Sequence, residues 1–174
     1  MGSALLLLTV GADAAASETA EDLSTFVETY RCSVVALLLR IHANPSRDLS
    51  RRFLILDKAD NGNDYVQCAF DDGDHTLLCE AASGFFAVPG TGPIFTPDER
   101  VALARLGFST DGSRRNFQRF LHFPSGPDND AIANLMLMAL YEGFGARQST
   151  VIEVTAPFAT RHGILRKDRC VPIS

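Results

Sequence analysis

The first long segment of the chain carries its apolar residues at the spacing of one helix face. Between Glu18 and Ala43 they recur every three or four positions. Ser17, with acidic residues close behind it, suits a helix start, and the sequence NPS at Asn44–Ser46 suits a stop. The pattern predicts one long amphipathic helix whose apolar stripe comprises Leu23, Phe26, Val27, Tyr30, Val34, Leu37, Leu38 and Ile41.

The next part of the chain has the composition and punctuation of β-strands. Three segments, Arg52–Ala59, Tyr65–Phe70 and His75–Ser83, are separated by the sequences DNGN and DDGD. Because Asn-Gly and Asp-Gly are strong hairpin signals, we expect two-residue turns at Asn61–Gly62 and Asp72–Gly73. The sequence therefore predicts a three-stranded antiparallel meander.

The second half alternates helices and strands. Thr96 can cap a helix that has Pro97 at its first position and Glu99 completing a capping box, and Gly107 ends it. The elements expected after it are a strand over Arg115–Phe123, a helix over Pro127–Gly145 and a strand over Ser149–Ala156.

These elements predict an α+β fold with a long N-terminal helix, an antiparallel β-meander extended by further strands, and a packed C-terminal helix. We expect a single domain over residues 17–156. An apolar N-terminal arm over residues 1–16 precedes it, and a C-terminal tail over residues 157–174 follows it.

The two turns set a register for the meander. With two residues in the DDGD turn, Cys68 lies opposite Leu77, and Cys68 and Cys79 are diagonal neighbours poorly placed for a disulfide. The DNGN turn adds Phe53 and Ile55 to the same face. We expect this face to be the core, with both cysteines as buried thiols. Its members on the last two strands are Val66, Cys68, Phe70, His75, Leu77 and Cys79.

The opposite face of the meander mixes apolar and polar side chains. Two interpretations stay open: a face partly covered by the last helix or the N-terminal arm, and a surface for a peptide or protein partner. In the second, leucines would anchor the partner, Gln67 and Tyr65 would orient it, and Lys58 and Glu80 would select charge. The candidate partner-binding residues are Leu54, Leu56, Lys58, Tyr65, Gln67, Leu78 and Glu80.

Composition narrows the class of protein. The 174 residues suffice for one core, and a net charge of −5 without a continuous basic stripe disfavours nucleic-acid binding. The four cysteines have no CxxC spacing, so reduced thiols in a cytoplasmic protein are expected. The apolar run Ala4–Val10 leaves open a secretory signal, a buried strand or a docked arm. It is too short to span a bilayer, and no membrane association is expected.

No catalytic or metal-binding pattern stands out. Asp71, Asp72 and Asp74 lack the order of a calcium loop, so we interpret them as a solvated turn. The four histidines have no serine or cysteine partner at a recognisable spacing, and GxSxG, HExxH and phosphate-loop sequences are absent. We therefore expect a protein that is not an enzyme, with no catalytic residues, no metal and no cofactor.

Five short sequences follow one another between Phe53 and Val154: YVQCAF, LLCEAASGFF, FTPDERVALARLGFS, NFQRFLHF and a helix ending in LYEGFG. Their order and spacing resemble the TY-Chap domain, the bacterial group allied to YbjN and the type III secretion chaperones. Phe108 stands where that family more often has tryptophan, and the N-terminus and tail lie outside the resemblance. The positions that carry it are Tyr65, Val66, Gln67, Leu78, Glu80, Ala81, Pro97, Leu106, Gly107, Asn116 and Phe117.

The resemblance implies the α+β fold of the secretion chaperones, which use it as a dimeric platform for extended peptide segments. We therefore expect a bacterial peptide- or protein-binding domain with a chaperone-like or regulatory role. The expected partner is a polypeptide, with a secreted or toxin-like protein as the candidate class and a homodimer as the candidate assembly. The alternative is a sensory or regulatory module that binds a small ligand in a pocket between helix and sheet.

Overall fold

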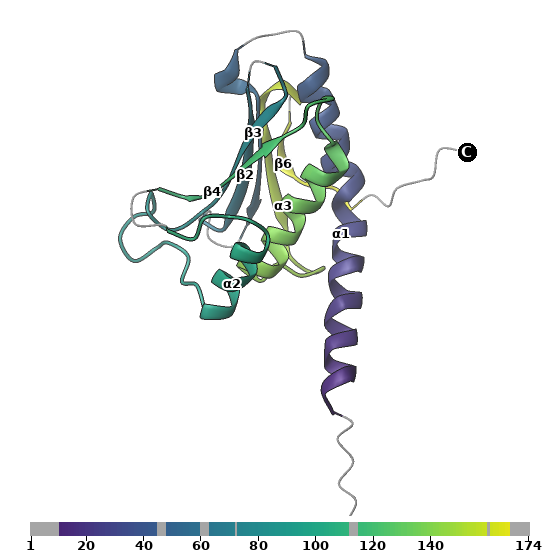
Figure 1. The fold of residues 1–174 in the computed structure, drawn as a ribbon, viewed down its shortest axis with the longest axis vertical. Coiled ribbons are helices and arrows are strands. Elements are labelled where there is room, and N and C mark those ends of the chain that lie inside the picture. The colour runs from purple at the N-terminus through teal and green to yellow at the C-terminus, as the bar shows by residue number, and fades with distance from the viewer. Residues whose placement is uncertain are drawn as a thin grey trace, which may run out of the picture.

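The computed structural model describes residues 11–44, 48–59, 63–71, 73–111, 115–159 and 161–167. Its strands and helices confirm the α+β class (Figure 1). In chain order the elements are α1 (Gly11–Ala43), β1 (Phe53–Lys58), β2 (Tyr65–Phe70), β3 (Thr76–Ala81), α2 (Pro97–Arg105), β4 (Phe117–His122), α3 (Asn129–Phe144), β5 (Ile152–Ala156) and β6 (Arg161–Ile164).

Local sequence signals explain where the two shorter helices begin and end. Thr96 accepts a hydrogen bond from the Glu99 N–H, and the Glu99 carboxylate accepts one from the Thr96 N–H, which is the predicted capping box of α2. Asp128 caps α3 in the same way through the Ala131 N–H. Gly145 ends α3 with a φ of 65°, a left-handed conformation that favours glycine.

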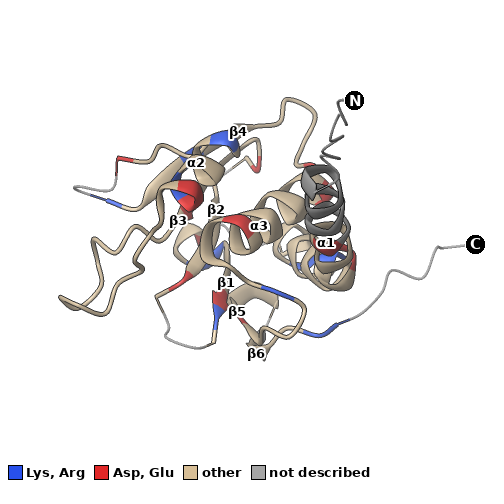
Figure 2. Ribbon diagram, turned by 90° about the horizontal axis from the view of Figure 1, so that it is seen from below, with Lys and Arg blue, Asp and Glu red and all other residues tan. Residues whose placement is uncertain are grey.

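The six strands form one antiparallel sheet in the order β4-β3-β2-β1-β5-β6. Helix α3 packs against β2 and β1, and α1 packs against α3. Seen from below, α3 lies between the sheet and α1 (Figure 2). The described helices therefore cover one face of the sheet, called here the inner face, and none of them lies over the opposite, outer face (Figures 1 and 2).

The register of β2 and β3 differs from the predicted one by two residues. Cys68 lies opposite Cys79 and Phe70 opposite Leu77. The Asp71 N–H donates to the Thr76 carbonyl, so the connection comprises residues 72–75 rather than a two-residue turn. A shift of two residues keeps every side chain on its predicted face, because side chains alternate with a period of two.

The register of β1 and β2 differs by one residue, and this error reverses β1. Leu54 lies opposite Cys68 and Leu56 opposite Val66, whereas Phe53 and Ile55 face the other way. The Lys58 N–H donates to the Asp64 carbonyl at 3.0 Å, which lengthens the connection beyond two residues. The predicted Asn61–Gly62 turn lies outside the described residues.

The inner face is the core. Apart from Lys58 at the end of β1, side chains on the inner side of the first three strands expose 3% or less of their surface, while their neighbours on the outer side are half-buried. The inner-face residues are Leu54, Leu56, Val66, Cys68, Phe70, Leu77, Cys79 and Ala81. They pack on apolar side chains of α3 and α1, among them Met136, Leu137 and Leu38.

Cys68 and Cys79 are joined by a disulfide, so the prediction of two buried thiols is wrong in chemistry although right in burial. The corrected register places the two residues directly opposite each other, with Cα atoms 4.1 Å apart. Cys32 is also disulfide-bonded.

The predicted boundaries change at both ends of the domain. Helix α1 begins at Gly11, within the segment expected to be an N-terminal arm. Strand β6 lies within the expected tail and pairs with β5, with Thr155 opposite His162. The sheet therefore extends one strand beyond the predicted domain. Whether the first ten residues or the last seven cover the outer face lies outside the described part of the chain.

Candidate binding face

The outer face consists of cross-strand rows of side chains. An apolar row runs across four strands, in which Phe120 pairs with Leu78, Leu78 with Ala69 and Ala69 with Phe53. Phe120 is 70% exposed, an unusual position for a large aromatic side chain on a sheet. This apolar row is therefore available to contact another molecule.

A hydrogen-bonded polar row lies beside the apolar row. Gln67 Nε2 donates to Glu80 Oε2 at 2.5 Å, and Gln118 Nε2 donates to Glu80 Oε1 at 2.9 Å. Both oxygens of Glu80 are thereby held in place by amides on the two neighbouring strands. Arg115 reaches the edge of this row from the loop before β4 and donates to Gln118 Oε1 at 3.3 Å. The row is a fixed set of amide and carboxylate groups.

The third row carries carboxylates. Asp57 lies opposite Tyr65 on one side and opposite Glu153 on the other. Burial, followed by the nearby charges of Glu153 and Asp64, raises the pKa of Asp57 to about 6. One carboxylate oxygen of Asp57 is buried and has no hydrogen-bond partner. This end of the outer face is thus acidic and offers an unused acceptor.

Tyr65 closes the same row beside a small hollow. Its hydroxyl accepts a hydrogen bond from Asn116 Nδ2 at 2.8 Å, and burial raises its pKa. A hollow of about 140 Å³ next to it is lined by Asn63, Phe86 and Pro93, among others. The loop over residues 83–95 that forms this hollow exposes large apolar side chains at Phe86, Val88 and Ile94.

Four of the seven candidate partner-binding residues lie together on the outer face. Tyr65, Gln67, Leu78 and Glu80 alternate with buried residues, as predicted. Leu54 and Leu56 do not belong to this face: both are completely buried in the core, because the register of β1 is shifted by one residue. They cannot anchor a partner without unfolding the sheet.

Lys58 is also displaced from its predicted row. It follows Leu56 on the inner side, where its ammonium lies 3.1 Å from Asp64 Oδ2 and donates to the Phe144 carbonyl at 3.1 Å. It therefore joins the end of β1 to the last turn of α3. It does not select charge on the outer face.

Sequence reasoning missed several members of the outer face. The sequence pattern places Phe53 and Ile55 in the core, and it predicts Gln118 and Phe120 only as residues of a strand. Alternation within the strand NFQRFLHF could have placed Gln118 and Phe120 on one face together, since residues two apart in a strand point to the same side. No pattern in the sequence could have placed Phe53, because its face depends on the length of a loop.

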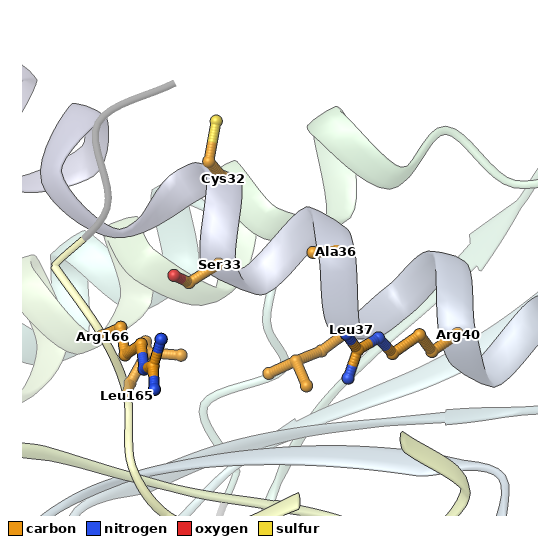
Figure 3. Close-up of a pocket in the computed structure, with 7 residues that line it drawn as sticks. All are labelled: Cys32, Ser33, Ala36, Leu37, Arg40, Leu165 and Arg166. Atoms are coloured by element: carbon orange, nitrogen blue, oxygen red, sulfur yellow. The ribbon is translucent and has the colours of Figure 1, made fainter. Parts of the chain in front are cut away.

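A second hollow, of about 420 Å³, lies between α1 and the segment that follows β6. Leu37 and Leu165 approach each other across it, and Arg40 and Arg166 stand at its sides, while Cys32 points away (Figure 3). Both arginines are exposed, and the described chain ends at Lys167, directly beside the hollow. None of the described residues that line this hollow is a buried polar residue that would mark a binding site.

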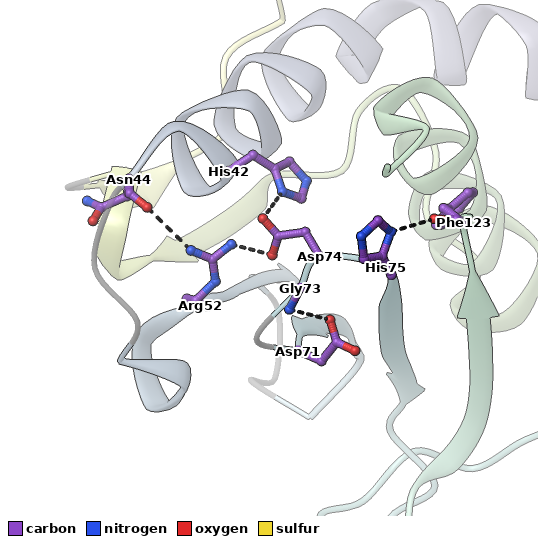
Figure 4. Close-up of polar contacts among 8 residues, drawn as sticks. All are labelled: His42, Asn44, Arg52, Asp71, Gly73, Asp74, His75 and Phe123. Carbon is purple, nitrogen blue, oxygen red and sulfur yellow. Dashed lines mark hydrogen bonds and ion pairs between the residues drawn. The ribbon is translucent and has the colours of Figure 1, made fainter. Parts of the chain in front are cut away.

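A polar cluster joins the end of α1 to the loop between β2 and β3. Asp74 forms an ion pair with the Arg52 guanidinium, and its Oδ2 lies 3.1 Å from His42 Nδ1 (Figure 4). Arg52 also donates to the Asn44 carbonyl at 3.4 Å, and the His42 ring stands edge-on to Phe70. Arg52 exposes only 5% of its surface, so the cluster pins the loop rather than presenting a reactive group.

His75 lies near this cluster but is not part of it. Its Nδ1 is 3.0 Å from the Phe123 carbonyl, and the residue is exposed in the loop rather than at the rim of the core face (Figure 4). Asp71 turns inward on its own loop, where it accepts from the Gly73 N–H. Within the described residues, no group of three or more histidine, cysteine or acidic side chains is arranged to hold a metal ion.

Comparison of the chain with protein-family models, with curated proteins and with solved structures gives no match. Within the described residues, no helix combines the length and the apolar character needed to cross a bilayer.

Proposed function

We propose that this chain is a non-catalytic domain that binds a polypeptide partner on the outer face of its sheet. The observation that carries the proposal is the uncovered apolar row, in which Phe120 is 70% exposed beside Leu78, and Ala69 and Phe53 continue the row on the next two strands. Sheets in a domain of this size normally bury an apolar surface against another layer, and an exposed one marks an interaction site. The resemblance to the TY-Chap and YbjN group remains a prediction that agrees with this role.

The charge of the outer face favours a basic segment as the occupant. Glu80, Asp57 and Glu153 are its three carboxylates, and none of the described strand residues that point outward is a lysine or arginine. Arg115 touches only the edge of the face. A partner with lysine or arginine between apolar residues would complement the carboxylate row and the apolar row together.

The unpaired carboxylate oxygen of Asp57 supports the same occupant. A buried acceptor without a hydrogen bond is costly, and it becomes satisfied if a donor from a bound segment reaches it. Burial and neighbouring charges raise the Asp57 pKa to about 6, so the group is mainly ionised at neutral pH and would attract a cationic donor. The Asp57 carboxylate therefore contributes to binding only when the pH is above its pKa.

Selection of peptides from a random display library on the immobilised domain tests this function. We expect enrichment of sequences that alternate apolar residues with lysine or arginine. The double variant Leu78→Asp/Phe120→Asp should lose at least about tenfold in affinity for the enriched peptides, because each removes an apolar contact. The matched control is Leu39→Asp/Val101→Asp, which alters exposed apolar residues on α1 and α2 and should leave the affinity unchanged. Equal losses in both, or no enrichment, would reject the proposal.

The disulfides bear on where the protein works. Cys68 and Cys79 are joined to each other, and Cys32 is bonded elsewhere, whereas the cytoplasmic location was expected from reduced thiols. We infer an oxidising compartment, since such compartments form and preserve structural disulfides. Alkylation of the denatured protein, taken directly from its host, should leave these cysteines unlabelled. Labelling of all of them would restore the cytoplasmic expectation.

A small-ligand module stays a second candidate because the structure has a pocket between helices and sheet. It lies where β1 ends, against α2 and the last turn of α3, and has a volume of about 330 Å³. A metabolite that raises the melting temperature of both the wild type and the outer-face variant would favour this role over polypeptide binding.

A further inference from the structure

The pocket at the end of β1, called here the end pocket, is lined by both apolar and charged residues. Its walls include Ile94, Phe95 and Phe144, and its polar groups are Lys58, Asp64 and Glu99. The volume of about 330 Å³ falls in the range of small-molecule sites. Apolar walls with a few convergent polar groups are the common composition of such sites.

The fold builds this pocket from three elements. A Cβ atom at Gly143 would lie 2.6 Å from Leu103 Cδ2, so glycine permits the close packing of α2 on the end of α3. The rings of Phe95 and Phe144 meet edge to face, with centroids 5.4 Å apart. The Lys58 ammonium holds the Phe144 carbonyl at 3.1 Å, which ties β1 to the same corner. The pocket is thus preformed rather than a gap between loose loops.

Asp64 is the group in the pocket that lacks a full set of partners. The residue exposes 7% of its surface, and its Oδ2 lies 3.1 Å from the Lys58 ammonium. Its second oxygen, Oδ1, is buried and accepts no hydrogen bond. A buried carboxylate oxygen without a donor costs free energy, so a bound donor would relieve that cost.

The electrostatics of the end pocket favour a cation. The lining holds two carboxylates, Asp64 and Glu99, against one ammonium, and the carbonyl end of α3 adds partial negative charge. Glu99 caps the start of α2 through Thr96, whereas Asp64 lies beside the Lys58 ammonium, so an anion at Lys58 would meet the Asp64 carboxylate. Phe95 already attracts one cation on its ring, the Arg100 guanidinium, which is 5.7 Å from the ring centroid.

We propose that the end pocket takes a primary ammonium or guanidinium group on an apolar stem, presented by a lysine or arginine side chain of the bound polypeptide. The charged group would donate to Asp64 Oδ1, and the stem would lie against Phe95 and Phe144. The inference rests on the proposed function for the identity of the partner. The pocket itself is separate from the outer face, since Lys58 is the last residue of β1 and Asp64 directly precedes β2, at one end of these strands.

Three single amino acids with blocked, uncharged termini serve as probes of the chemistry of the pocket in the absence of any partner. They are the N-acetyl N-methylamides of lysine, norleucine and glutamate, titrated into the ¹⁵N-labelled full chain. We expect the lysine probe alone to shift the amide signals of Asp64, Phe95 and Phe144 in a saturable way. Equal shifts with norleucine, stronger shifts with glutamate, or no saturable shift with lysine would overturn the proposal.

Variants locate the site. Asp64→Asn should weaken binding of the lysine probe by about tenfold or more, because a charge-assisted hydrogen bond is lost. Glu28→Gln removes the same charge from an exposed position on α1 and should leave binding unchanged. If Asp64→Asn fails to fold, Ile94→Lys serves instead: Ile94 is 95% exposed, and a tethered ammonium at the pocket should displace the probe. Unchanged binding in a folded variant would contradict the assignment.

The same probes separate this inference from the proposed function. The outer-face variant Leu78→Asp/Phe120→Asp should still bind the lysine probe, since neither residue lines the end pocket. Loss of peptide binding with the probe retained supports both conclusions. Retained peptide binding in that variant would reject the outer face and leave the pocket standing, whereas failure of the probe alone would reject only the pocket.

Discussion

The two faces of the sheet are built from the same strands but differ in burial. On the inner face Leu54 and Leu56 are completely buried beneath α3, while on the outer face their neighbours Phe53 and Ile55 are only half-buried. The outer face also holds a hydrogen-bonded row of Gln67, Glu80 and Gln118. Alternate positions of one strand therefore differ in burial, and in the proposed function only the outer ones contact the partner.

Substitutions at adjacent positions of β1 give the sharpest contrast between the faces. Leu56→Ala should lower the free energy of unfolding by about 3–4 kcal/mol, because it leaves a cavity in the core. Ile55→Ala, one residue away, should cost about 1 kcal/mol or less, since that side chain stays partly hydrated. Urea unfolding at equilibrium measures both. A larger loss for Ile55→Ala would mean that the faces have been assigned the wrong way round.

The difference between the two faces depends on the register of the strands. The ion pair between Arg52 and Asp74 helps to fix that register, because it joins the start of β1 to the loop between β2 and β3. Asp74→Asn should cost about 2–3 kcal/mol, because it leaves the buried Arg52 guanidinium without its carboxylate. Asparagine tolerates the φ of 56° at this position, so backbone strain does not confound the result. Asp71→Asn in the same loop is the control and should cost less than about 1 kcal/mol. Similar losses in the two variants would show that the ion pairs contribute little.

The disulfide tests whether the inner face needs its covalent link. The double variant Cys68→Ala/Cys79→Ala should lower the free energy of unfolding by about 2 kcal/mol under non-reducing conditions, since the bond closes a loop with a sequence separation of 11. The variant retains the Cys32 disulfide, so the effect belongs to the bond across β2 and β3. Unfolding midpoints that match the wild type would contradict a stabilising role.

The smallest expected effect is a pH dependence from the outer face. Asp57 has its pKa raised from 3.8 to about 6, so the folded state holds the proton more tightly than the unfolded state. Its contribution to stability is therefore greatest at low pH and declines as the pH rises through that interval. Asp57→Asn should remove this decline and stabilise the protein at pH 7 by less than about 1 kcal/mol. A variant that unfolds with the wild-type pH profile would exclude Asp57 as the cause.

Sequence patterns were enough for the helices and for strands β1 to β5, but not for β6 or for the pairing of the strands. Helical spacing marked α1 and α3, and the capping box at Thr96 marked α2, because these signals are local. Which side chains of β1 face the core depends instead on the length of the loop before Asp64. A register shifted by one residue puts Leu56 in the core, where Ile55 was expected. The partners of Cys68 were missed for the same reason: the turn before Thr76 is longer than its Asp-Gly sequence suggests.

The sequence correctly placed those candidate residues whose strands were shifted by an even number of residues, because such a shift leaves each side chain on the same face. Tyr65, Gln67, Leu78 and Glu80 kept their face because the β2–β3 register moved by an even number of residues. Asp64 and Phe144, which meet at the end pocket, are 80 positions apart in the sequence by simple difference of their numbers. Nothing in the order of the residues predicts such a meeting, since it arises from the packing of α3 on the sheet.

The side-chain amide signals of Gln67 and Gln118 test the central claim most directly. Both amides hold Glu80 on the outer face, so their ¹H–¹⁵N resonances report on anything that lands there. Titration with a peptide enriched by selection on the domain should shift both resonances in step with binding, and the Leu78→Asp/Phe120→Asp variant should abolish the shifts. Resonances that stay in place while the peptide binds, with changes confined to α1 or the segment after β6, would contradict the outer face as the binding surface.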